Sequence, residues 1–149
     1  MDTLPQIMLL CRPGFESECA AELLDHAQEA GFPAYLNARP DTGFALLVSA
    51  QGHDTRGLIN RLDFRTLIFA RQWFASTEQI SDLPDRNRTA PLVDIATRIA
   101  QLLHSKFCDV ELSYADTNEG KTLNRFCKAF RPHMLAALEQ HRLVSPGAT

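Results

Sequence analysis

The chain has 149 residues, of which 45% are hydrophobic and 22% charged, and its formal net charge is −3. These values are typical of a globular protein of one domain or two small ones. No apolar run approaches the about 18 residues that a membrane span needs, and residues 1–12 lack the pattern of a secretory signal. The missing span predicts no membrane partner. The four cysteines show no CxxC spacing, which predicts reduced thiols and a cytoplasmic location.

The charge is distributed unevenly between the two halves of the chain. Residues 1–80 contain six arginines and ten acidic residues, a net charge of −4, whereas residues 81–149 contain nine basic and eight acidic residues, a net charge of +1. The overall charge therefore does not predict a nucleic-acid partner. Such a partner would need a local basic patch, which we expect in the second half.

The first half alternates between strand and helix patterns. The predicted elements are strands at 7–11, 34–38, 44–48 and 66–75, and helices at 15–30 and 54–62. The helix at 15–30 has one apolar stripe, and Asp54 is placed to cap the second helix. The order β-α-β-β-α-β predicts a ferredoxin-like subdomain over residues 1–80. The first and third strands are apolar throughout, which suits the middle of the sheet.

The last of these strands includes residues 67–74 and contains Trp73, the only tryptophan of the chain. Neither alternating face of this stretch is cleanly polar, so both faces are expected to be partly covered. Trp73 and Phe74 are therefore predicted as core residues. Base stacking by an exposed Trp73 is the alternative.

The second half gives a less complete pattern. Residues 81–90 are polar and predict a linker, Thr89 and Pro91 then start an apolar-striped helix, and residues 108–114 alternate as a half-buried strand. A further helix is predicted to open at Asp116, with Glu119 completing a capping box, and to kink or break at Pro132. Because one strand cannot make a sheet, we expect that this unit is incomplete. Either it borrows strand pairing from the first unit or from a partner chain, which predicts self-association, or the natural protein continues past Thr149.

A row of four basic residues follows in the predicted helix: Lys121, Arg125, Lys128 and Arg131. The first three are expected on one helical face, with Arg131 near its edge, opposite an inward stripe of Leu123, Phe126, Cys127 and Phe130. Cations mounted rigidly over an apolar face suit contacts with a phosphate backbone, and Arg86 and Arg88 in the linker could extend the patch. An ordinary solvated helix face accounts for the row equally well.

Motifs that carry chemistry are missing from the sequence. There is no Gly-x-Gly, so no loop for a dinucleotide or S-adenosylmethionine is predicted, and there is no Gly-x-Ser-x-Gly or His-Glu-x-x-His. No Cys and His spacing fits a zinc finger. The residues therefore predict no catalytic group, no cofactor and no metal in this chain.

Three blocks resemble the bacterial RlmM family of S-adenosylmethionine-dependent methyltransferases. The first is Leu9-Leu10-Cys11-Arg12-Pro13-Gly14-Phe15-Glu16 followed by Glu18-Cys19-Ala20-Ala21-Glu22, the second is Leu67 to Phe74, and the third is Ala115-Asp116-Thr117-Asn118-Glu119 followed by Lys121, Leu123, Phe126-Cys127 and Phe130. They occur in the family's order and span nearly the whole chain. The resemblance therefore implies a specific family, which the residue spacings described above do not.

The resemblance implies an α+β protein with a ferredoxin-like subdomain over 1–80 and the front part of an RNA-binding THUMP domain, an incomplete α/β unit, over 81–149. It further implies 23S ribosomal RNA as partner, with a cytidine ribose 2′-hydroxyl as the methylated group, and S-adenosylmethionine as the cofactor of a parent protein. The family's catalytic domain has no counterpart in these 149 residues, so this chain is expected to be a non-catalytic N-terminal fragment that places RNA. The alternative is a protein-interaction or ligand-sensing ferredoxin-like module that does not bind RNA.

Overall fold

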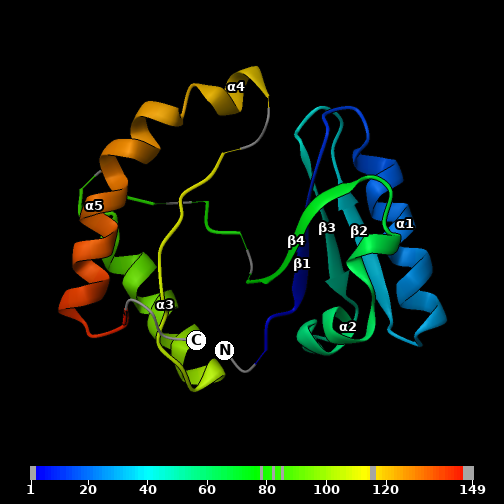
Figure 1. Ribbon diagram of the computed structural model, residues 1–149, viewed down its shortest axis with the longest axis horizontal. Coiled ribbons are helices and arrows are strands. Elements are labelled where there is room, and N and C mark those ends of the chain that lie inside the picture. The colour runs from blue at the N-terminus through cyan, green and yellow to red at the C-terminus, as the bar shows by residue number, and fades with distance from the viewer. Residues whose placement is uncertain (1–2, 78, 82, 85, 115–116, 146–149) are drawn as a thin grey trace. The chain divides into compact units, whose positions relative to one another are not determined.

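The computed structural model describes residues 3–77, 79–81, 83–84, 86–114 and 117–145, and the chain divides into two units (Figure 1). The first unit contains Thr3–Gln79 together with the short helix α4 (Asn118–Lys121). The second unit contains Ile80–Tyr114 and the residues from Thr122 onward. Each unit has its own apolar core.

The first unit contains a four-stranded antiparallel sheet. Its strands are β1 (Gln6–Cys11), β2 (Ala34–Ala38), β3 (Phe44–Ser49) and β4 (Ala70–Ser76), in the order β2-β3-β1-β4. Leu9 pairs with Ala45 on one side and with Trp73 on the other. The predicted ferredoxin-like pattern is confirmed, including the central position of the first and third strands.

Two helices, α1 (Glu16–Glu29) and α2 (Arg56–Arg61), cover one face of this sheet (Figure 1). The buried core between helices and sheet consists of Ile7, Leu9, Cys11, Cys19, Leu23, Ala27, Leu47 and Leu58. The predicted stripe of the first helix is confirmed at Cys19, Leu23 and Ala27. Phe15 lies one residue before α1, is 40% exposed and stacks on Phe69.

The start of α1 is joined to the β2–β3 turn by a buried carboxylate. Glu16 is only 2% exposed, and its two oxygens accept the backbone N–H groups of Gly14, Asp41 and Gly43 at 3.0–3.1 Å. Burial alone would raise the pKa of Glu16, but these N–H donors outweigh it and lower the pKa. Gly43 has a φ of 80°, a conformation that glycine adopts without strain.

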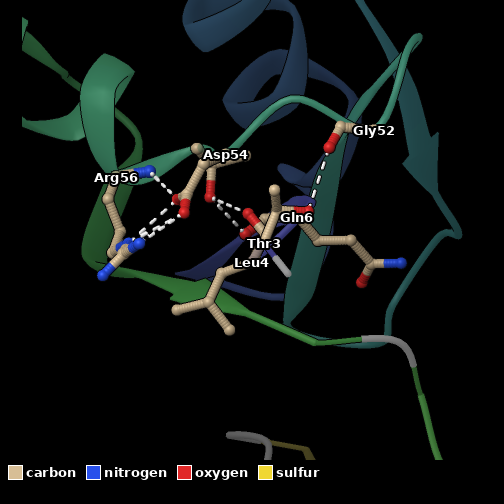
Figure 2. Close-up of polar contacts among 7 residues, drawn as sticks. Thr3, Leu4, Gln6, Gly52, Asp54 and Arg56 are labelled. Atoms are coloured by element: carbon tan, nitrogen blue, oxygen red, sulfur yellow. Dashed lines mark hydrogen bonds and ion pairs between the residues drawn. The ribbon is translucent and has the colours of Figure 1, made fainter. Parts of the chain in front are cut away.

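The beginning of α2 is tied to the beginning of β1 (Figure 2). The buried Thr55 hydroxyl donates to the carbonyls of Leu4 and Gln6, at 2.7 and 2.9 Å. Asp54 accepts the backbone N–H of Arg56 and forms an ion pair of 2.6 Å with its guanidinium, so hydrogen bonding to Arg56 lowers the pKa of Asp54. The helix begins two residues later than predicted, and Asp54 still satisfies an N–H of its first turn.

The predicted strand at 66–75 begins too early. Phe64–Thr66 is a 3-10 helix, η1, and β4 begins at Ala70. The Glu22 carboxylate accepts the N–H groups of Ile68 and Phe69, at 2.7 and 3.2 Å, which satisfies these donors without a neighbouring strand. Within β4, Trp73 lies half-buried on the helix side of the sheet, and its ring lies 5.4 Å from that of Phe64 at a tilt of 45°.

The opposite face of the sheet carries neither α1 nor α2 and is largely apolar. Met8 pairs with Leu46 and Phe74 across it, and Leu10 pairs with Phe44. Leu46 is buried, whereas Phe74 is 37% exposed and Tyr35 on β2 is 55% exposed. We call Met8, Leu10, Tyr35, Phe44, Leu46, Val48 and Phe74 the helix-free face.

The second unit consists of two packed helices, α3 (Thr89–Leu103) and α5 (Asn124–Gln140) (Figure 1). Its buried core is formed by Val93, Met134, Leu138 and Leu143. The predicted break at Pro132 is wrong, because α5 runs through this residue. Pro132 is exposed, so the hydrogen bond that its ring removes lies on the solvent side of the helix.

The predicted strand at 108–114 is also wrong, because these residues form no regular element. Just before them, Phe107 forms a single parallel bridge with Val144, through hydrogen bonds to Leu143 and Ser145, both 2.8 Å. The carbonyl of Val110 accepts a hydrogen bond from Arg131. A ladder therefore does not propagate from the bridge, since the described second unit offers no adjacent strand.

Candidate nucleic-acid interface

Among the described residues, no group of three or more His, Cys, Asp or Glu side chains could hold a metal ion. None of the helices in the described part of the chain is long and apolar enough to cross a membrane. The candidate site is the set of basic side chains that the sequence singled out, and the structure places these in four different settings.

Arg125 and Lys128 form the exposed part of this set. Both lie on α5, three residues apart, so they share one side of the helix. Both side chains are exposed, and no ion pair involves either of them among the described residues. The sequence contains no acidic residue from Lys121 to Leu138, so no carboxylate within this stretch competes with an anionic ligand.

Arg131 has a structural role instead. Its guanidinium donates to the Val110 carbonyl at 2.7 Å and to the Asp109 carboxylate at 2.8 Å. Arg131 lies six residues after Arg125, about 120° from it around the helix and close to the buried flank of Met134 and Leu138. This position explains why it contacts the segment that packs beside α5.

Lys121 is separated from the other three basic residues. It ends α4, and Thr122 and Leu123 interrupt the helix before α5 begins at Asn124. Lys121 belongs to the first unit and Arg125 to the second. The predicted continuous helix, and the single helical face for Lys121, Arg125 and Lys128, are therefore wrong. Gly120 and Thr122 flank Lys121, and the low helix propensity of both residues explains the interruption. The predicted cap Asp116 lies outside the described residues.

Arg86 and Arg88 lie at the entrance to α3. Arg86 is exposed in the segment before the helix, and Arg88 directly precedes Thr89. The Arg88 guanidinium donates to the Pro84 carbonyl at 3.1 Å and lies over the ring of Phe126, 5.3 Å from its centroid. Arg88 thereby connects the start of α3 to the start of α5.

A stack of side chains continues from this contact, and the sequence did not reveal it. The rings of Phe126 and Phe130 are nearly parallel, with centroids 5.3 Å apart and an interplanar angle of 13°. We call these residues the Arg88–Phe126–Phe130 column. The helical spacing of Leu123, Phe126, Cys127 and Phe130 predicted an inward stripe. That prediction is wrong for Phe126 and Leu123, which are 41% and 49% exposed. Helical periodicity showed that they share a side and not that the side is covered.

The two units differ in charge as well. The first unit, with Ala115–Lys121, carries seven basic and eleven acidic residues, a net charge of −4. The second unit, to which Met1–Asp2 also belong, carries eight basic and seven acidic residues, a net charge of +1. The exposed cations of α5 thus belong to the less negative of the two bodies, which favours contact with a polyanion there.

Comparison with known proteins gives related results for both units. The family described as RlmM ferredoxin-like domain matches residues 4–74. Proteins named ribosomal RNA large subunit methyltransferase M from Salmonella arizonae, Shigella sonnei and Salmonella paratyphi B are each 38% identical to the chain over 133 residues. Those residues are 89% of this chain and 35% of each relative. The chain therefore spans about a third of the length of these curated relatives.

Proposed function

Since residues 4–74 match the RlmM ferredoxin-like domain family, we propose that this chain is the RNA-binding N-terminal region of a ribosomal RNA large-subunit methyltransferase. In this proposal it helps to place 23S ribosomal RNA for a catalytic domain outside these 149 residues, which would use S-adenosylmethionine to methylate a cytidine ribose 2′-hydroxyl. The second unit would be the front part of a THUMP domain, and the site of action would be the cytoplasm. The observation that carries the proposal is the 38% identity to proteins of that name, which extends beyond the matched domain into the second unit.

The physical support comes from α5. Arg125 and Lys128 are exposed cations on a helix held in place by the Met134 and Leu138 core contacts. When cations on a rigid helix contact phosphates, the counterions condensed on the RNA are released. This release supplies affinity that is independent of the RNA sequence. We propose Arg125 and Lys128 as the principal phosphate contacts, with Arg86 and Lys121 as further contacts. Arg88 and Arg131 make the contacts described above.

A salt titration tests this function. Filter binding of a structured ribosomal RNA fragment is measured for the wild type and for the double variant Arg125→Gln, Lys128→Gln over a range of salt concentrations. Each lost phosphate contact is expected to reduce the log–log salt slope by roughly 0.7 to 0.9. Affinity should fall for unrelated RNAs to about the same extent, because backbone contacts carry no base information.

Arg98→Gln is the matched control. Arg98 is an exposed cation of the same unit, but it forms an ion pair with Asp94 on α3, and the structure offers no reason for it to contact RNA. The control is expected to keep the wild-type slope. If the wild type shows no salt-dependent RNA binding, the proposed function is wrong. If Arg98→Gln changes the slope as much as the double variant does, the assignment to α5 is wrong.

A protein-interaction module is the second candidate, and one observation favours it. The helix-free face is apolar, carries the exposed Tyr35 and Phe74, and belongs to the unit with a net charge of −4. Exposed apolar patches often mark protein contacts, and a negative surface repels RNA. Binding that is insensitive to salt and is lost in Phe74→Asp, with Arg125 and Lys128 intact, would support this function over RNA binding.

A further inference from the structure

We infer that the Arg88–Phe126–Phe130 column is a stacking platform for an unpaired RNA base, with Arg125 and Lys128 holding the phosphates on either side of that nucleotide. This inference rests on the proposed RNA-binding function and adds the kind of RNA that is bound. It identifies the partner as single-stranded or looped RNA rather than a continuous duplex.

The geometry of the column carries the first step. Phe130 packs against the second core. The ring of Phe126 lies nearly parallel to that of Phe130, with centroids 5.3 Å apart, and the Arg88 guanidinium lies over the Phe126 ring, 5.3 Å from its centroid. The column therefore runs from the core outward, and its outer members are Phe126, 41% exposed, and Arg88. Guanidinium planes and aromatic rings are the two groups on which proteins stack unpaired bases.

Rigidity carries the second step. Arg88 is held by its bond to the Pro84 carbonyl and by the ring beneath it, and Phe126 is held by Phe130. A base that stacks on this column orders few additional side chains, so more of the stacking energy remains as affinity. A base that stacks on the outer end of the column also removes part of the exposed Phe126 surface from water.

The neighbouring charges carry the third step. Arg125 precedes Phe126 directly and Lys128 follows it by two residues, so both cations lie on α5 within one turn of the ring. No acidic residue lies between Lys121 and Leu138. A base held on the ring would bring its own phosphates toward cations rather than carboxylates, whereas bases inside an A-form duplex are already stacked and cannot reach the column.

The test uses the 149-residue chain and a hairpin RNA with 2-aminopurine placed either in the loop or in the stem. Binding should quench the loop probe and leave the stem probe unchanged. Phe126→Leu, which keeps an apolar side chain but removes the ring, is expected to abolish the quenching and to weaken loop binding by about tenfold. Phe126→Ala should do the same, and Arg88→Gln should reduce both effects.

Tyr35→Leu is the matched control, because it removes an exposed aromatic ring from the first unit, which contains no member of the column. It should retain the quenching and the affinity. Salt-sensitive binding that Phe126→Leu leaves unchanged would overturn the platform and leave the proposed function standing. Equal quenching of loop and stem probes would also overturn it, and a complete lack of RNA binding would overturn the platform together with the proposed function.

Discussion

The carboxylate of Glu16 accepts the backbone N–H of Gly43 at 3.0 Å, across 27 positions of the chain. The same carboxylate accepts the N–H groups of Asp41 and Gly14, so one side chain joins the turn before α1 to the β2–β3 turn. Glu16→Gln would place an amide NH₂ against these donors. We expect the free energy of unfolding of the first unit to fall by about 2–4 kcal/mol. Chemical denaturation followed by Trp73 fluorescence measures this, with the exposed Glu18→Gln as a control that should change little.

The stability that Glu16 provides should depend on pH. The folded-state pKa of Glu16 is lowered, so its contribution is present above the unfolded pKa of a glutamate, about 4.3. It is lost as the pH falls through the lower, folded value. The stability of the wild type should therefore decrease more steeply below about pH 4.3 than that of Glu16→Gln. Parallel curves for the two proteins over this range would contradict the role given to the carboxylate.

Trp73 should contribute less than a fully buried tryptophan does. Its ring is half-buried against Phe64 and the first core, so Trp73→Ala is expected to cost about 2 kcal/mol, below the 3–5 kcal/mol of a buried ring. Far-UV circular dichroism must follow this unfolding, because the variant has no tryptophan. Phe74→Ala, on the helix-free face, should cost less. Equal losses at both positions would mean that the two faces of β4 are equally covered.

Arg131 should affect stability rather than RNA binding. Arg131→Gln removes the donors to Val110 and Asp109, and we expect the second unit to lose about 1–2 kcal/mol. Hydrogen exchange should become faster in residues 108–114, which Arg131 holds against α5. Arg125→Gln is the comparison, since its surface position predicts a change within about 0.5 kcal/mol. An RNA salt slope that falls for Arg131→Gln without faster exchange would reverse this assignment.

Self-association is expected from the second unit at high concentration. Leu123, Phe126, Leu103 and Tyr114 are 37–49% exposed there, and large exposed apolar side chains promote association. Sedimentation velocity should show a dimer or larger species for the wild type and less of it for Leu123→Glu. Ile68→Glu is the control, since Ile68 is 81% exposed in the first unit. A monomer at all concentrations would contradict this expectation.

The first unit could be predicted well from the sequence, because the apolar patterns of its strands and helices are strong and involve residues close together in the chain. Continuous apolar runs marked β1 and β3, and a stripe of Cys19, Leu23 and Ala27 marked α1. The start of β4 was missed because Glu22, 46 positions away, satisfies Ile68, and such a tertiary hydrogen bond leaves no local pattern.

The candidate site was harder to predict, for a related reason. A helical spacing places residues on one side but does not say whether that side is covered, so Phe126 was expected inside and is exposed. The helix is interrupted at Thr122, so Lys121 does not lie on the same helix as the other three cations. Arg131 donates a hydrogen bond to the Val110 carbonyl. Arg125 and Lys128 remain where the spacing placed them, because they lie within one uninterrupted helix.

The chain passes through the first unit twice, once along Thr3–Gln79 and again at α4. Both ends of Ile80–Tyr114 are therefore attached to the same body, so this segment is a closed loop even when α3 is unfolded. Closing a loop costs entropy that grows with the logarithm of its length. Once α4 has joined the first unit, the entropy of closing this loop has already been lost. The unfolded segment that contains α3 then has fewer conformations, so less entropy is lost when α3 folds. The thermal stability of the second unit thereby depends on the first through chain connectivity.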